Sequence, residues 1–189
     1  MSAAATVATA APLSAAQHKA ALWDDEQLQV YAVVMGSRIP DLQSRLLTAE
    51  LHDHDCLLPG ALEPEEQLGA PYLLHLKRDA AFTDWLLFEA PQSLAEWGVL
   101  VRSSAPLTRL RNHLRGHLQA SLPTGQDIAL DWMDRDILVA LLTHADAAML
   151  GQFFGPVSSY TVAGSQGWRH AALALNGLQQ HEVPLARAA

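Results

Sequence analysis

The stretch WGVLVRSSAPLTRLRNHLRGHLQ, residues 97–119, holds the clearest strand and the clearest helix of the chain. Its apolar start, WGVLV, is followed by Arg102 and the serine pair Ser103-Ser104, and this pattern predicts a buried strand. After Pro106, leucines recur at positions 107, 110, 114 and 118, which is the spacing of one helical face. The stretch therefore predicts a strand followed by a helix whose leucines face the core.

Strand and helix patterns continue on both sides of this stretch. Upstream, the apolar run 30–35 predicts a strand, and leucines at helical spacing after Asp41 predict a helix that Asp41 caps. Downstream, the patterns predict a hairpin around 123–125, two helices of which the second ends at a Gly-Pro pair, and a hairpin across 164–167. Because strands and helices mix without strict alternation, we expect an α+β (mixed α/β) fold, with a mixed or antiparallel sheet flanked by helices.

The pattern of the chain suggests a leader, one domain and a tail. Residues 1–23 are rich in alanine but lack the basic start and apolar centre of a signal peptide, so we expect a flexible leader. Residues 24–177 form the predicted domain, divided into an N-terminal lobe at about 24–100 and a C-terminal lobe at about 101–177. The stretch 178–189 is weakly patterned, and we expect a tail there.

The composition argues against several classes of partner. The 189-residue chain has a net charge of −8, which disfavours binding to nucleic acid or to an anionic membrane surface. A single cysteine excludes an internal disulfide and fits a reducing compartment. The sequence has no apolar run long enough to span a membrane. We therefore expect a cytoplasmic protein without a nucleic-acid partner or a stable membrane association.

The segment LHDHDC, residues 51–56, alternates His and Asp before the cysteine. Imidazole, carboxylate and thiolate groups bind transition metals. In an extended segment His52 and His54 point to the same side, which supplies half of a zinc site. We favour a different interpretation, in which the segment is the polar end of the preceding helix and the entry to a short strand.

A second candidate metal site lies in the helix of the opening stretch. His113 and His117 have the spacing of the HExxH zinc proteases, but Leu114 occupies the position of their catalytic glutamate, and three arginines on the same helix would repel a dication. The chain also lacks a G-x-S-x-G nucleophile elbow and the glycine-rich phosphate-binding motifs. We expect no catalytic residue, no metal and no cofactor.

Arginines gather in the same region of this acidic chain. No acidic residue lies between them, and they occupy positions 102, 109, 111 and 115. Two interpretations stay open. The arginines could form a protein-binding patch, since arginine is favoured at interfaces, or they could form a solvated helix face.

Several segments of the chain, in their order and spacing, resemble the type VI secretion effector chaperones, also called effector adaptors. The segments are YAVVMGSRIPDL, APYLLHL, WGVLVRSSAPLTRLRNHLRGHLQASLPTGQDIALDWMDRDIL and QFFGPV. The family pattern has a strand that ends in a small-residue turn, a Trp-Gly strand ending in serine, a leucine-rich helix with His-Leu-Arg, a hairpin with Leu-Pro-x-Gly, and a helix ending in Phe-Phe-Gly-Pro. The resemblance covers about residues 28–175 and is densest at 97–156.

The chain departs from the family pattern after the predicted hairpin. Where the family has a basic residue followed by Asp-Pro-Arg, this chain has Asp131 and then Asp134-Arg135-Asp136. If these positions touch a partner, the partner of this protein should differ in charge. If they form a structural salt bridge, that bridge is absent or reversed here.

The resemblance implies a cytoplasmic adaptor without enzymatic activity. Such a protein binds a secreted effector, often at the effector's N-terminal region, and helps to load it onto a valine-glycine repeat spike or a PAAR-type spike tip. The expected partner-binding residues are Arg102, Arg109, Arg111, Arg115, Asp131, Asp134, Arg135 and Asp136. Two alternatives stay open. One is an immunity protein that inhibits a toxin, and the other is a small metal-dependent hydrolase that combines the HDHD segment with His113 or His117.

Overall fold

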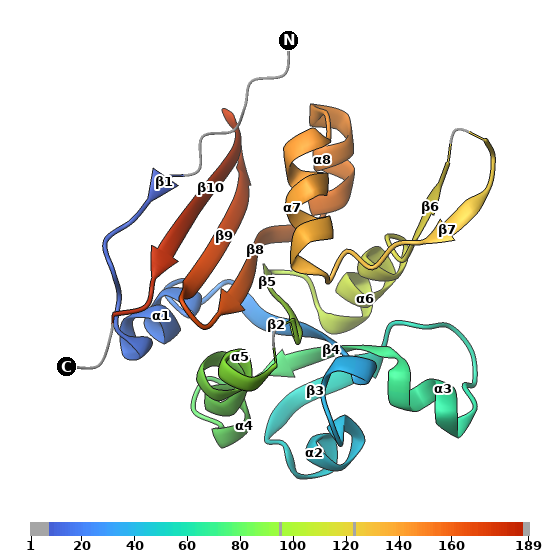
Figure 1. The fold of residues 1–189 in the computed structure, drawn as a ribbon, viewed down its shortest axis with the longest axis horizontal. Helices are drawn as coiled ribbons and strands as arrows, with labels where there is room; N and C mark the ends of the chain where they lie inside the picture. The colour runs from blue at the N-terminus through green and yellow to red at the C-terminus, as the bar shows by residue number, and fades with distance from the viewer. Residues whose placement is uncertain (1–7, 95, 123, 187–189) are drawn as a thin grey trace.

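An eight-stranded sheet runs through the molecule in the order β1-β10-β9-β8-β5-β2-β4-β3 (Figure 1). The structure is a computed structural model, and it describes residues 8–94, 96–122 and 124–186. Neighbouring strands are antiparallel, except that β1 is parallel to β10. The strands are β1 Ala8–Thr9, β2 Gln29–Met35, β3 Leu51–Cys56, β4 Pro71–Leu76, β5 Gly98–Ser103, β8 Val157–Gly164, β9 Gly167–Ala174 and β10 Gly177–Pro184. The predicted α+β fold is confirmed.

The strands at the centre of the sheet are buried on both faces. Along β2, Val34 belongs to one apolar cluster and Val33 to the other, which explains why this strand is a continuous apolar run. Beside it, β5 approaches very closely, because a Cβ atom at Gly98 would lie 1.9 Å from the Val33 carbonyl oxygen. Trp97, just before β5, buries its indole, and Gly98, the first residue of β5, has no side chain to block the close contact with β2.

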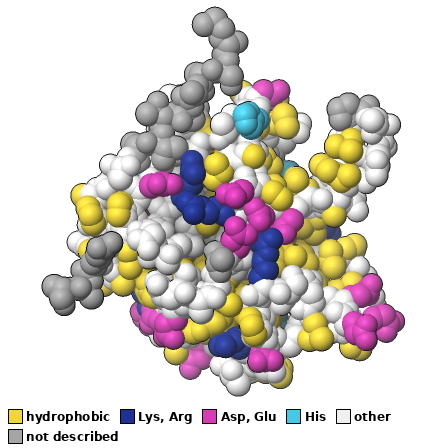
Figure 2. Space-filling model, viewed as in Figure 1, with side chains coloured by type: hydrophobic (Ala, Val, Ile, Leu, Met, Phe, Trp, Pro, Cys, Tyr) yellow, Lys and Arg dark blue, Asp and Glu magenta, His cyan; other side chains and the backbone are white. Residues whose placement is uncertain are grey.

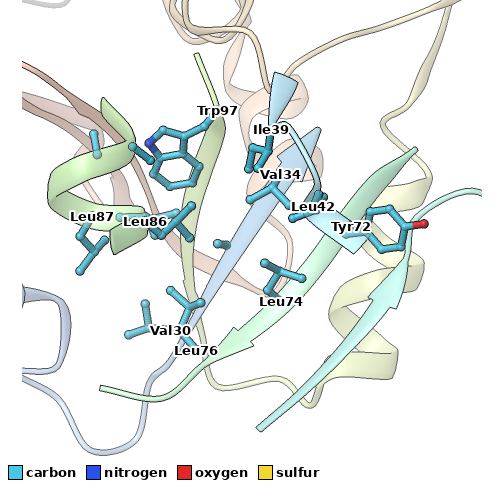
Figure 3. Close-up of a cluster of buried hydrophobic side chains, with 14 of the residues drawn as sticks. Val30, Val34, Ile39, Leu42, Tyr72, Leu74, Leu76, Leu86, Leu87 and Trp97 are labelled. Atoms are coloured by element: carbon cyan, nitrogen blue, oxygen red, sulfur yellow. The ribbon is translucent and has the colours of Figure 1, made fainter. Parts of the chain in front are cut away.

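Helices cover both faces of the sheet and bury the two apolar clusters. On one face, Trp97, Leu86 and Leu74 belong to a cluster that is covered by α1, α2, α4 and α5 (Figure 3). On the other face, α6, α7 and α8 cover a cluster that includes Trp132 and Phe153. The helices are α1 Ala15–Leu22, α2 Leu42–Thr48, α3 Pro64–Gly69, α4 Ala81–Asp84, the π-helical turn Trp85–Glu89, α5 Ala90–Ser93, α6 Leu107–Arg115, α7 Arg135–His144 and α8 Ala147–Phe154, with a 3-10 turn at Gly36–Arg38. None of the described helices is long and apolar enough to cross a membrane.

Most elements downstream of the opening stretch lie where the sequence predicted them. Strands β6 Gln119–Ser121 and β7 Asp127–Ala129 form the first hairpin, which is separate from the sheet, and β8 and β9 form the second. Helix α8 ends at Gly155, as predicted. Asp41 precedes α2, but its side chain caps nothing, because the residue adopts a left-handed φ of 56°. That predicted cap was wrong.

The ends of the described chain are more ordered than the sequence predicted. Within the predicted leader, Ser14 begins α1 with a capping box, and α1 buries His18 and Leu22. Within the predicted tail, β10 pairs along its whole length with β9. The sequence pattern did not predict α1 or β10, because their buried faces are short or contain polar residues.

The division into two lobes stays a prediction. The sheet itself is continuous across the proposed boundary, because β5 pairs with β2 on one side and with β8 on the other. Residues 1–7 of the predicted leader and 187–189 of the predicted tail lie outside the described residues.

Candidate partner-binding surface

The HDHD segment forms β3, the strand at one edge of the sheet, and not the end of a helix. Helix α2 has already ended at Thr48. The Asp53 carboxylate accepts the backbone N–H of His54 at 2.8 Å, and the Asp55 carboxylate accepts that of Cys56 at 2.8 Å. These N–H groups therefore bond to the strand's own side chains, and the charges discourage pairing with another strand. The alternation of aspartates protects an exposed sheet edge.

Histidine side chains from both candidate metal sites pack against other residues of the protein. In β3, the His52 ring lies 4.5 Å from the ring of His75 on β4. In α6, His113 Nε2 lies 3.0 Å from the Phe153 carbonyl oxygen, and the His117 ring lies 5.2 Å from the Phe153 ring. Burial, reinforced by the neighbouring His113, lowers the pKa of His117 to about 4. Within residues 8–94, 96–122 and 124–186, no three His, Cys, Asp or Glu side chains are placed to hold a metal ion.

The arginines of α6 mostly hold β3 and the residues after it. Arg111 forms an ion pair with Asp55. Arg115 donates three hydrogen bonds to backbone carbonyls, to Leu57 at 2.7 Å and to Cys56 and Leu58 at 3.2 Å each. By contrast, the side chain of Arg109 is exposed. Arg111 and Arg115 of α6 are therefore in direct contact with the HDHD segment and the residues that follow it, although the two regions are far apart in the sequence.

Arg102 lies apart from the other arginines, under α1. It forms an ion pair with Asp24, beside a cavity of about 260 Å³ that is also lined by His170 and His181. Burial, and then the charges of His181 and Arg102, lower the pKa of His170 to about 4. At neutral pH this largely apolar cavity is therefore lined by an uncharged His170 and by the Arg102–Asp24 ion pair.

Two aspartates of the segment that departs from the family pattern, Asp131 and Asp134, lie beside one cation. Arg38, from the turn after β2, lies 2.5 Å from the Asp131 carboxylate and 3.6 Å from that of Asp134. Asp134 also caps α7 by accepting the backbone N–H groups of Asp136 and Ile137, at 2.9 and 3.1 Å. A structural salt bridge is therefore present, with its carboxylates on the 131–134 segment and its guanidinium on Arg38.

A fourth carboxyl group, that of Glu96, completes an acidic cluster, which we define as Glu96, Asp131, Asp134 and Asp136. A hydrogen bond with Asp134, then burial, raise the pKa of Glu96. Burial opposes ionisation of Asp134, but hydrogen bonds from backbone N–H groups and from Glu96, together with the charge of Arg38, hold its pKa below the usual value. The remaining predicted residue, Arg135, points elsewhere and lies 3.8 Å from Glu182.

The structure thus sorts the eight predicted partner-binding residues into separate places. Arg111 and Arg115 hold β3, Arg102 lies under α1, Asp131 and Asp134 form ion pairs with Arg38, and Asp136 lies in the first turn of α7. Their role in partner binding stays a prediction. Sequence reasoning missed Arg38, Glu96 and Asp55 as members of these contacts. Of these three residues, only Arg38 lies in a segment that carries the resemblance, YAVVMGSRIPDL. The resemblance could therefore have pointed to Arg38 but not to Glu96 or Asp55.

Comparison with known proteins gives one result. Neither the search of curated proteins nor the search of solved structures found a match to the chain. A family model described as "Domain of unknown function (DUF4123)" matches residues 30–152. The matched span begins in β2 and ends within α8, so it includes α6, the β6–β7 hairpin and the acidic cluster. The match covers well over half of the chain, and the chain therefore belongs to the DUF4123 family.

Proposed function

We propose that this protein is a cytoplasmic effector adaptor of a type VI secretion system. It binds a secreted effector, at the effector's N-terminal region, and helps to load it onto a valine-glycine repeat or PAAR-type spike protein. The observation that carries the proposal is membership of the DUF4123 family across residues 30–152, together with the ordered resemblance of the same segments to effector adaptors. In this proposal the protein escorts its partner and catalyses no reaction.

Two features of the molecule support a role in binding. Apolar side chains are exposed on the β6–β7 hairpin and on two helices, including Ile128 on β7, Ile137 on α7 and Met149 on α8. The acidic cluster lies at the base of the same hairpin and supplies a charged surface for partner selection. An adaptor needs surfaces of this kind, because it covers apolar effector surface that would otherwise aggregate.

Affinity purification of the tagged protein from its native host, with mass spectrometry of the captured proteins, tests the proposal. We expect a large secreted effector, with or without a spike protein. Deletion of the gene should then abolish secretion of that effector while leaving the producing cell unharmed. If deletion instead poisons the producing cell and the protein blocks the toxin's activity, the chain is an immunity protein and the adaptor proposal is wrong.

A further inference from the structure

The β6–β7 hairpin projects from the body of the molecule (Figure 1). Its register pairs Ala120 with Ile128, and hydrogen bonds of 2.8 Å from Leu122 to Gln126 and from Leu130 to Leu118 extend the pairing in both directions. Side chains directly opposite each other in antiparallel strands share a face, and that face repeats every second residue. One face of the hairpin therefore carries five apolar residues, Leu118, Ala120, Leu122, Ile128 and Leu130, with one polar residue, Gln126, opposite Leu122 near the turn.

Only the inner half of this apolar face is covered. Leu118 and Leu130 pack against the core cluster beneath α6, α7 and α8. Further out, Leu122 is 39% exposed and Ile128 is 36% exposed. A two-stranded hairpin is marginally stable in water by itself and gains stability when a helix packs against its apolar face. The outer half of this face thus suits an apolar helix supplied from outside the chain.

The charge beside the hairpin determines what kind of helix fits. Asp131 follows Leu130 directly, and the acidic cluster that it joins has four carboxyl groups, whereas Arg38 supplies one guanidinium within salt-bridge distance of Asp131 and Asp134. Figure 2 shows carboxylates gathered near the centre of this face of the molecule, between two groups of Lys or Arg side chains, with apolar side chains on the hairpin to one side. A partner that covers both regions must combine apolar with basic side chains.

The two ends of the sheet are less suited to the same partner. At one end, the aspartates of β3 already accept the N–H groups of His54 and Cys56. At the other end, β1 pairs with β10 through Ala8 and Thr9. A partner strand at β3 would have to displace these side-chain contacts, and at the other end the edge strand β1 is only two residues long. A helix could pack on the outer half of the hairpin's apolar face without displacing any described element.

We propose that the outer apolar face of the β6–β7 hairpin, together with the acidic cluster, docks an amphipathic helix with basic flanking residues, contributed by the escorted effector. Ile128 and Leu122 pack against the apolar stripe of that helix, and the carboxylates bind its Lys or Arg side chains. The assignment of the helix to an effector rests on the proposed function. The chemistry of the docking surface does not.

A synthetic helical peptide with leucines on one face and lysines on the other is the probe for the surface itself. We expect saturable binding to the full chain by fluorescence anisotropy. The variants Ile128→Ser and Leu122→Ser should each weaken binding about tenfold. The matched control is Leu175→Ser, because Leu175 is the fully exposed leucine at the β9–β10 turn and should leave binding within about twofold. Equal binding by wild type and Ile128→Ser, at unchanged thermal stability, would overturn the proposal.

A photo-crosslinking amino acid at position 128 or at position 175, in the native host, tests the assignment of the helix to an effector. We expect a crosslink to the effector from position 128 and none from position 175. If the effector co-purifies but crosslinks from position 175 alone, the docking surface is wrong and the adaptor role stands. If the peptide binds as described and no effector is captured by the wild type, the adaptor role fails and the docking surface stands.

Discussion

Gly155 ends α8 at a position where the backbone and a neighbouring ring both exclude a side chain. Its φ is +45°, and a Cβ atom there would lie 2.4 Å from Cε1 of His113. We expect Gly155→Ala to lower the free energy of unfolding by about 1–3 kcal/mol, measured by urea denaturation. Gly151→Ala is the control, because Gly151 lies inside α8 and no atom outside the adjoining backbone of the helix lies within 4 Å of its Cβ position. Equal loss of stability in both variants would contradict this explanation of the Phe-Phe-Gly-Pro motif.

Buried neutral histidines make the stability of the protein sensitive to acid. Burial lowers the pKa values of His117 and His170 to about 4, below the ordinary histidine pKa of 6.5. The unfolded chain therefore binds protons more readily than the folded chain. The free energy of unfolding is at its full value above pH 6.5, where both histidines are neutral in either state, and it decreases as the pH falls from 6.5 to about 4. We expect the urea midpoint to fall over this range.

Replacement of one imidazole tests the origin of that acid sensitivity. His117→Leu should make the fall in the urea midpoint shallower, because the unfolded variant has one proton fewer to bind. His144→Gln, at the exposed end of α7, should keep the wild-type profile. Identical profiles for wild type and His117→Leu would show that His117 does not contribute.

At the scale of secondary-structure elements, α6 is joined to β3 by Arg115. Its three hydrogen bonds go to backbone carbonyls of residues 56–58. We expect Arg115→Ala to destabilise the protein by about 1.5–3 kcal/mol, because hydrogen bonds from a charged donor are lost and carbonyls are left unpaired. Arg109→Ala removes the same charge from an exposed position and should change the free energy of unfolding by less than about 0.5 kcal/mol. Calorimetry of both variants measures the difference.

The edge strand β3 should resist aggregation because of its aspartates. Asp53→Ala leaves the N–H of His54 without its 2.8 Å acceptor and removes a charge from the edge. We expect faster aggregation of this variant on mild heating, followed by light scattering, since an exposed unpaired edge recruits other strands. Asp79→Ala makes the same charge change at a side chain that is 91% exposed, away from the sheet edge, and should aggregate as the wild type does.

Individual elements differ in how far the sequence predicted them, for physical reasons. β2 and β5 were predictable because they are buried on both faces and therefore appear as apolar runs. β3 was missed because an edge strand protected by aspartates has no apolar alternation. α1 was missed because its buried residues are one histidine and one leucine. The candidate site was harder still, because Arg38 and Asp131 are 93 residues apart in sequence, and no local pattern reports such a pair.

At the scale of the whole molecule, residues 8–22, which form β1 and α1, belong to the outer end of the sheet. Lys19 lies 2.7 Å from the Asp84 carboxylate, and α1 buries His18 against Trp168, with ring centroids 4.5 Å apart. Deletion of residues 1–23 should therefore speed amide hydrogen exchange in β8–β10, with little change in β2 and β4. Mass spectrometry of exchanged peptides measures this. Uniform exchange rates before and after deletion would mean that the segment is the disposable leader that its composition suggests.

The parallel pairing of β1 with β10 also has a consequence for synthesis of the protein. A ribosome makes β1 first of these strands, but its partner β10 emerges only after every other strand of the sheet. The pairing of β5 with β8 is delayed in the same way. Because contacts so distant in sequence form slowly, the edges of β1 and β5 that pair with β10 and β8 stay unpaired in the nascent chain until β8 to β10 have been made. If the protein covers the apolar surface of an effector, as we propose, it has unpaired strands of its own to cover while it is being made.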